Sequence, residues 1–369
     1  EEIEAVGGEL NAATGLETTA YFARVLKGDE GVALELLADI LLNSRFSPDE
    51  LEREREVILQ EIASTRDSPE DIAFELVNEA AYPEQALGRT ILGPATNVRR
   101  FSPGDLTRFL NTHYRPQRMV LSAAGAIRHA PLVRHVEALF GGLTPEGGKG
   151  EERARYQGGV RWHHKRFEQS HLALAFDSPS YRDIAYFTAQ VFSGLFGGGM
   201  SSRLFQGARE KRGLCYSIYS SAWGLGDTGL LAVHAATGTE LMASLIDVTG
   251  GELEDVAARG PSAAELHRAK AQLKAGLLIS LESSSARAEQ MARHKLAHRR
   301  VIRNDQQKRK LDKVGAEDDA AIAGELLAQK PAVAEVGAGK ASERLASETA
   351  ERIGRATIGR VARTARWRS

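Results

Sequence analysis

The feature of the chain that most constrains its fold is a helical pattern that occurs twice, 215 residues apart. The stretch ELEREREVILQEI, which begins at Glu50, is mirrored by ELHRAKAQLKAGL, which begins at Glu265. A serine stands three residues before each glutamate, at Ser47 and Ser262, and this spacing is typical of a capping box at a helix start. Strand-like residues 118–125 and 330–337 continue the repeat. A repeat of this length predicts two similarly built domains.

The fold class expected from this repeat is α+β, with two homologous domains that each pack a mixed, mainly antiparallel sheet against helices. A length of 369 residues also exceeds what one hydrophobic core normally holds. The Gly-rich, charged stretch TPEGGKGEERARYQGG is typical of a linker. The predicted parts are an N-terminal domain, a linker, a C-terminal domain and an Arg-rich tail, at 1–143, 144–159, 160–340 and 341–369. Two interpretations of the tail stay open, a helical or frayed end and a basic surface-binding segment.

Apolar spacing and turn residues also predict the individual elements. Strands are expected at residues 10–25 (two strands around a turn), 119–124, 171–176, 216–220, 229–235 and 330–337. Helices are expected at residues 29–42, 47–64, 68–81, 102–111, 131–140, 184–195 and 240–257, and after Ser262.

Charge and cysteine content exclude several classes of protein. The net charge of −1 gives no reason to expect a nucleic-acid partner, and no apolar run is long enough to span a membrane. The single cysteine, Cys215, excludes an internal disulfide, which favours the cytoplasm over secretion without fixing the compartment. The opening EEIEAV followed by Gly7-Gly8 is typical of the end of a helix, so we expect that sequence upstream of Glu1 has been lost.

Two carboxylates stand out on the helix that follows Ser47. Glu54 and Glu61 are seven residues apart and therefore project from nearly the same side, which we interpret as the apolar stripe containing Val57 and Ile62. Burying an unpaired carboxylate costs free energy. A carboxylate at such a position is therefore expected to contact a cation or a metal, or to have a raised pKa. The alternative is that they lie at the edge of the stripe and pair with nearby arginines. Their mirrored positions hold Ala269 and Gly276, so the shared architecture does not require the acids.

A second candidate group is RLFQGAREKRGLCYSIYS, residues 203–220. Arg209 lies near a helix end that Gly213 terminates, and Tyr216 begins the following strand. Together they can donate hydrogen bonds to a carbonyl oxygen. The alternative is a basic helix end next to ordinary strand tyrosines.

Other motifs give weaker indications of function. The stretch Gly197-Gly198-Gly199 matches neither of the phosphate-binding patterns GxxxxGK(S/T) and GxGxxG. His294 and His298 could share a metal, but a solvated helix face is the preferred interpretation. Cys215, in an apolar strand, is interpreted as core packing.

The motifs taken together resemble the pitrilysin/insulinase-type zinc metallopeptidases, especially the branch similar to mitochondrial processing peptidase and its bacterial relatives. The resemblance covers roughly residues 1–340 and rests on GGELNAAT, ELEREREVILQEI, LGRTILG, HYRPQRMVLSAAG, GGGMSSRLFQGAREKRGLCYSIYS and SLESSSARAEQMAR. It implies zinc as cofactor, a chamber that encloses extended or unfolded peptide, and a homodimer or a heterodimer with a related subunit.

The resemblance also assigns residues. Glu61 matches the third zinc ligand. Glu54 matches an acid that does not bind the metal itself but orients a ligating His. Arg209 and Tyr216 match the pair that holds the substrate backbone and stabilises the oxyanion. Asn11 and Ala12 lie on the strand that pairs with extended substrate.

The chain departs from the family pattern because it contains no HxxEH, the motif of two zinc ligands and the general base. We therefore expect this chain to lack tight zinc binding and peptidase activity, with the motif in the missing upstream segment. The rival hypothesis is a non-catalytic partner or scaffold subunit of the same family. A third and weaker hypothesis is a protein that binds nucleic acid through the Arg-rich tail.

Overall fold

The computed structural model describes residues 1–143 and 152–358. The chain divides into two compact units, each assembled from three separate stretches. Unit 1 comprises Glu1–Ile62, Ile91–Glu152 and Leu278–Ile302, and unit 2 comprises Ala63–Thr90, Arg153–Leu277 and Arg303–Ser369. The units therefore interleave along the sequence, whereas the sequence predicted one boundary within residues 144–159. Residues 144–151 of that predicted linker lie outside the described residues.

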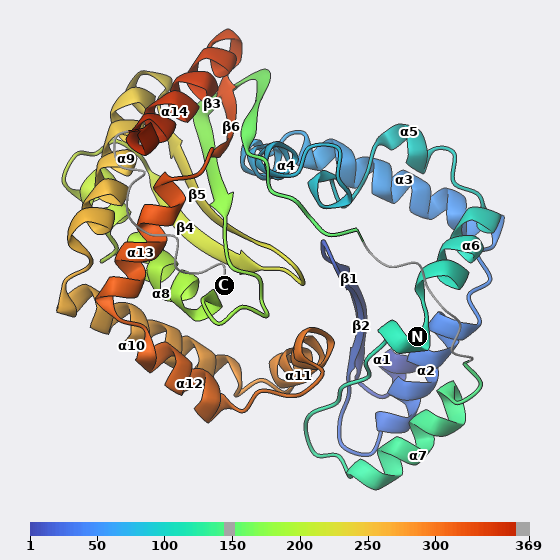
Figure 1. Cartoon of the computed structure of the whole chain (residues 1–369). Helices are drawn as coiled ribbons and strands as arrows, with labels where there is room; N and C mark the ends of the chain where they lie inside the picture. The colour runs from blue at the N-terminus through green and yellow to red at the C-terminus, as the bar shows by residue number, and fades with distance from the viewer. Residues whose placement is uncertain (144–151, 359–369) are drawn as a thin grey trace. The chain divides into compact units, whose positions relative to one another are not determined.

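Unit 2 is built on a four-stranded sheet with the order β4-β5-β3-β6 (Figure 1). The strands are β3 (Gly159–Asp177), β4 (Ser217–Gly224), β5 (Gly229–Thr237) and β6 (Ala332–Ala338). β5 pairs antiparallel with both β3 and β4. Every residue of β5 is buried, as expected for a strand covered on both faces.

β3 is longer than predicted and pairs with β6 twice. Its first arm, from Gly159 to His163, runs beside Ala332–Val336 in ascending order, and its second arm, from His171 to Ala175, pairs with the same residues in descending order. The sequence predicted only the second arm, because the first arm leads directly into the polar run HHKR, residues 163–166, which lacks a strand pattern.

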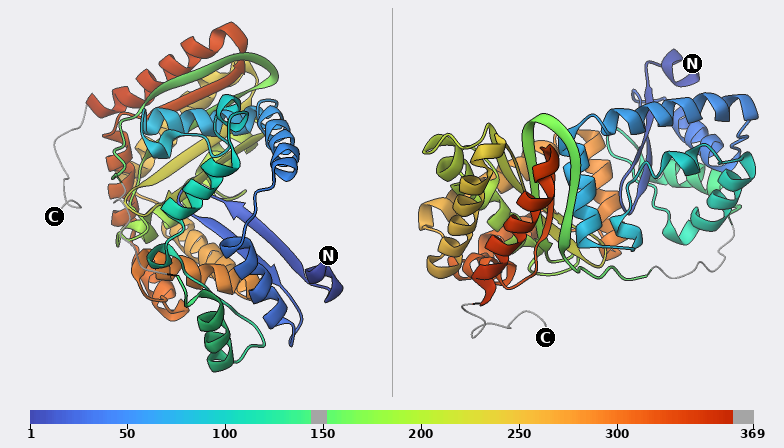
Figure 2. Two further views of the ribbon diagram at one scale, coloured as in Figure 1. Left: turned by 90° about the vertical axis from the view of Figure 1, so that its right-hand side faces the viewer. Right: turned by 90° about the horizontal axis from the view of Figure 1, so that it is seen from above.

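Helices cover both faces of this sheet (Figures 1 and 2). Helix α4 (Pro69–Ala81) packs on one face, where the strands present mostly small residues such as Ala173, Ala232 and Ala334. The other face packs against α8 (Tyr186–Gly197), α9 (Met242–Arg259), α13 (Ala316–Leu327) and α14 (Ser342–Ile358). Helices α10 (Ala263–Ser280) and α12 (Asn304–Lys313) complete unit 2, with α10 continuing to Leu277 within it.

Helix α14 falls within the stretch that the sequence assigned to an Arg-rich tail. Leu345, Ala346 and Ile353 are buried in the main core of unit 2, so the described part of this stretch is a packed helix. The predicted Arg-rich tail at 341–369 also includes residues 359–369, which lie outside the described residues.

Unit 1 contains a two-stranded antiparallel sheet of β1 (Glu9–Thr14) and β2 (Thr19–Arg24). Its helices are α1 (Glu2–Ala5), α2 (Glu30–Leu42), most of α3 (Pro48–Thr65), α5 (Ala95–Val98), α6 (Pro103–His113), α7 (His129–Phe140) and α11 (Ser284–His298). The end of α1 is a Schellman motif, in which Gly8 N–H bonds Ile3 O and Gly7 N–H bonds Glu4 O. The α+β class, with mainly antiparallel sheets packed against helices, is thus confirmed, and the first arm of β3 pairs parallel with β6.

The strand predicted at Met119–Ala124 is absent, because these residues form no ladder in the structure. A strand exists only where another backbone pairs with it. The mirrored segment 330–337 becomes β6 because β3 flanks it on both sides. Among the helices of the described residues, none combines the length and apolar content needed to cross a bilayer.

Candidate functional site

Glu54 and Glu61 lie on the exposed side of α3, in unit 1. The prediction placed them with Val57 on an apolar stripe, but Val57 is itself 46% exposed. The buried side instead follows Leu51, Ile58 and Ile62. The expectation of buried carboxylates is therefore wrong, and burial gives no reason for a cation beside them.

Arg55 explains why the stripe was misplaced, because this charged residue lies on the buried side. Its side chain is only 14% exposed, and its guanidinium donates hydrogen bonds to the carbonyls of Val98, Arg99 and Phe101. Those bonds satisfy the charge within the protein. Its carboxylate contact is with Glu52. In the described residues, neither Glu54 nor Glu61 pairs with an arginine, so both carboxylates remain available to an external group.

These carboxylates do not complete a metal centre by themselves. A catalytic zinc normally has three protein ligands and an open position. Within residues 1–143 and 152–358, no three His, Cys, Asp or Glu side chains lie close enough to hold a metal ion. The described residues therefore do not fit a whole zinc site, although Glu61 carries the chemistry of one ligand.

Asn11 and Ala12 lie on β1, opposite Phe22 and Tyr21 of β2. Both are exposed, and β2 is the one partner of β1 in its sheet, which leaves the other edge of β1 without a neighbouring strand in the described structure. The Ala12 amide donates to the side-chain Oδ1 of Asn11 at 2.8 Å. An unpaired edge of this kind is a template for an added strand.

Arg209 and Tyr216, in unit 2, lie together. The guanidinium carbon Cζ of Arg209 is 5.5 Å from the centre of the Tyr216 ring and 4.6 Å from that of Phe205. Tyr216 is 74% exposed, and no hydrogen bond or ion pair links either polar head group to another described residue. The pair can therefore offer N–H and O–H donors to a carbonyl oxygen.

Local structure places this pair. Arg209 is in η3 (Phe205–Glu210), a short π-helix, a geometry that occurs mostly at single turns and often at functional sites. Gly213 has a φ of +61° and reverses the chain toward β4, as its predicted helix-terminating role requires. The amide of Tyr216 then donates to Ala236 O at 3.3 Å, which joins it to the sheet.

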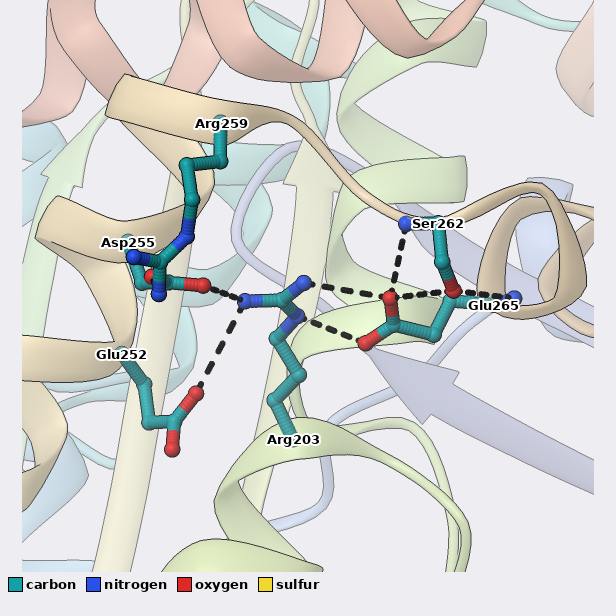
Figure 3. A network of polar contacts seen from close by, with 6 residues as sticks. All are labelled: Arg203, Glu252, Asp255, Arg259, Ser262 and Glu265. Carbon is teal, nitrogen blue, oxygen red and sulfur yellow. Dashed lines mark hydrogen bonds and ion pairs between the residues drawn. The ribbon is translucent and has the colours of Figure 1, made fainter.

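A polar network just before η3 was missed by the sequence analysis (Figure 3). Arg203 binds Glu265 through Nε and Nη2 at 2.7 and 3.1 Å, and Asp255 through Nη1 at 2.6 Å. Glu252 is 3.8 Å away, and Arg259 binds Asp255 from its other side. Burial by itself raises the pKa of Glu265, but hydrogen bonds from Arg203 and Ser262 outweigh it and lower that pKa to about 2. The network ties the segment just before η3 to α9 and α10.

A second missed group lies between α4 and the sheet. His171 Nδ1 is 3.2 Å from His234 Nε2, and His234 Nδ1 is 3.8 Å from Glu70 Oε1. The Tyr219 hydroxyl donates to the same Glu70 oxygen at 2.6 Å. Burial lowers the pKa of His234 to about 4, more than Glu70 raises it. The sequence carried no signal for this group, because its members come together only through strand pairing and the packing of α4 on the sheet.

The remaining motifs serve structure. His294 is buried and accepts a hydrogen bond from Ile302 N at 3.3 Å, so the predicted solvated face is wrong for this residue. Burial lowers its pKa to about 4. Cys215 is buried, as predicted, and burial raises the pKa of its thiol. At Gly197 a side chain would collide with Ser220, so this glycine serves close packing of α8 on β4.

Two family models match the chain. "Insulinase (Peptidase family M16)" matches residues 1–95, and "Peptidase M16 inactive domain" matches residues 100–273.

Named relatives and a solved structure agree with these matches. An uncharacterized zinc protease of Mycobacterium tuberculosis (strain ATCC 25618 / H37Rv) is 36% identical over 341 residues, covering 91% of this chain and 78% of the relative. The uncharacterized zinc protease YmxG of Bacillus subtilis (strain 168) is 33% identical over 297 residues, covering 80% and 72%. The structure of a protease from Helicobacter pylori superimposes with a TM-score of 0.81 at 21% identity, over 90% of this chain and 83% of that one. This structural likeness supports the fold.

Proposed function

Because the chain belongs to the insulinase-type peptidase family M16, we propose that it takes part in zinc-dependent endoproteolysis of extended peptides. The family expected from the sequence motifs is confirmed. The observation that carries the proposal is the pairing of Arg209 with Tyr216, whose donors have no polar partner within the described structure.

Arg209 and Tyr216 hold the substrate at a peptide carbonyl. As a nucleophile adds to that carbonyl, negative charge develops on its oxygen. Preorganised donors aimed at that oxygen stabilise the transition state more than the ground state. Arg209 supplies a fixed positive charge and Tyr216 supplies a neutral donor, so losing either lowers kcat more than it raises KM.

Glu61 supplies one zinc ligand, and Glu54, two turns earlier on the same side of α3, orients a ligating His. The two remaining ligands and the general base come from sequence outside these 369 residues. The exposure of both carboxylates, neither of which has an ion-pair partner in the described residues, supports their availability to a metal site. The chain by itself is then inactive.

The free edge of β1 binds the extended substrate by strand addition, at Asn11 and Ala12. Main-chain hydrogen bonds give affinity without demanding one side-chain sequence. Because Asn11 Oδ1 occupies the Ala12 amide, an arriving strand has to displace it.

The test is zinc content and peptidase activity of the complete gene product and of its Glu61→Gln variant. Glu56→Gln is the matched control, since Glu56 is an exposed acid elsewhere on α3. We expect Glu61→Gln to lower zinc content at least tenfold and to abolish cleavage, while Glu56→Gln behaves as wild type. Unchanged zinc in Glu61→Gln would refute the ligand role.

A second candidate is a non-catalytic subunit that pairs with an active chain of the same family. A subunit of this kind needs no zinc site of its own, and the described residues contain no group of three metal-ligating side chains. It predicts a complete gene product that binds no zinc and forms a heterodimer with a related subunit, whereas the enzyme predicts bound zinc and a homodimer or heterodimer. Zinc analysis and mass measurement of the native assembly separate the two.

A further inference from the structure

The three arginines around η3 differ in how their charges are satisfied. Arg203 is enclosed by the carboxylates of Glu265 and Asp255, with Glu252 a little farther away (Figure 3). Arg212 donates to the carbonyl of Gly207 at 2.6 Å. Arg209 lies against two aromatic rings and has no polar partner in the described residues.

The nearer of those rings belongs to Phe205, which precedes Arg209 by four residues in the same π-helix. In a π-helix the hydrogen bonds close between residues five apart, so residues four and five apart share a face. The preceding neighbours of Phe205 and Arg209, Leu204 and Ala208, are both fully buried and fix the segment in the core. The backbone that carries the two partly buried side chains is therefore held in place.

A cation over an aromatic ring is attracted to the ring without using its N–H donors. A carboxylate would hold the guanidinium equally well but would occupy those donors and neutralise the charge. The Phe205 ring holds the Arg209 side chain and leaves its N–H donors free to form hydrogen bonds.

We infer that Phe205 is a positioning residue for Arg209, which fixes the guanidinium against Tyr216 while keeping its donors free for substrate. This inference rests on the proposed role of Arg209. The ring lowers the cost of ordering a long, flexible side chain before substrate arrives.

The test is steady-state kinetics of the complete gene product with Phe205→Leu and Phe205→Tyr. Phe187→Leu is the matched control, because Phe187 is also partly buried and carries a cation, Lys310 Nζ at 5.0 Å from its ring centre. We expect Phe205→Leu to lower kcat about 3–10-fold with KM changed less than twofold. Phe205→Tyr, which keeps the ring, should stay within twofold of wild type, as should Phe187→Leu. If Phe205→Leu fails to fold, Phe205→Met, which preserves volume, carries the same expectation.

The variant Arg209→Ala distinguishes this inference from the proposed function. If Phe205→Leu lowers kcat in the wild type but has no further effect in Arg209→Ala, the ring acts through Arg209. A normal kcat in Phe205→Leu, or an equal loss in both backgrounds, overturns the positioning role and leaves the function of Arg209 standing. A wild-type kcat in Arg209→Ala overturns the proposed function itself, and this inference with it.

Discussion

Arg203 donates two hydrogen bonds to the Glu265 carboxylate, and the two side chains are 12% and 19% exposed. The pair joins the segment before η3 to the first turn of α10, so it connects the candidate substrate-binding arginine to the main core of unit 2. A shielded, two-point ion pair of this kind contributes more than a surface pair does.

We predict that Glu265→Gln lowers the free energy of unfolding by about 1–3 kcal/mol near pH 7, because the charge-assisted bonds are lost. The pKa of Glu265 is about 2 in the folded protein against an ordinary 4.5. The folded form therefore binds this proton less tightly than the unfolded chain, and stability is present above about pH 4.5 and lost as the pH falls toward 2. Urea denaturation across this range should show a shallower pH dependence in the variant. Glu348→Gln, which loses an exposed pair with Arg344, is the control and should change stability by less than about 0.5 kcal/mol.

Asp319, on α13, is fully buried, and neither carboxylate oxygen has a hydrogen bond within the described structure. Burial, followed by the charge of Asp318, raises its pKa from 3.8 to about 8. The folded protein thus binds this proton more tightly than the unfolded chain, and stability falls as the pH rises from about 4 to 8. We predict that Asp319→Asn is more stable than wild type by about 1–3 kcal/mol at pH 8, with a smaller difference at pH 5. Glu317→Gln, at an exposed acid of the same helix, should show no such trend, and a constant offset for Asp319→Asn would contradict the explanation.

His234 should make unit 2 sensitive to mild acid. Its pKa is about 4 in the fold against an ordinary 6.5, chiefly through burial. The unfolded chain therefore takes up the proton first, so stability present above about pH 6.5 is lost as the pH falls toward 4. We predict that His234→Gln flattens this part of the stability profile, while His267→Gln, at an exposed histidine of α10, leaves it unchanged. Thermal melting at pH 4.5, 5.5 and 7 measures the difference.

Ala12→Pro tests strand addition at the free edge of β1. Proline removes the one amide that Asn11 now occupies, so an added peptide loses a main-chain hydrogen bond. In the complete gene product we expect KM for a peptide substrate to rise about tenfold, the effect of roughly 1.4 kcal/mol, with kcat nearly unchanged. An unchanged KM in a variant with a normal melting temperature would exclude this edge as the substrate-binding strand.

Local signals predicted most of the helices. Ser68 and Ser102 accept hydrogen bonds from Asp71 and Asp105, and both helices start at the following proline. Such caps depend on a few neighbouring residues, so they can be recognised in the sequence. Arg209 and Tyr216 lie together because a helix end, a glycine and a strand start follow one another within eight residues, and their role in substrate binding stays a prediction.

What failed depended on distant parts of the chain. Met119–Ala124 has a strand composition but pairs with no other strand of the described residues. Arg55 lies on the buried side of α3 only because three carbonyls of residues 98–101 receive its guanidinium. The roles of Glu54, Glu61, Asn11 and Ala12 in zinc and substrate binding stay predictions, since they concern groups that bind from outside these residues.

The position of α4 in unit 2 also affects folding during synthesis, and it determines where the chain can be truncated. The helix ends at Ala81, yet β6, which it covers, begins at Ala332. At about 5–20 residues per second, a ribosome finishes that strand roughly 10–50 seconds after the helix. During that interval α4 has an apolar side without its partner and needs shielding by a chaperone or by non-native contacts. A fragment starting at residue 160 omits the helix and leaves one face of its sheet bare, so it should aggregate, whereas adding residues 63–90 as a separate peptide should restore solubility.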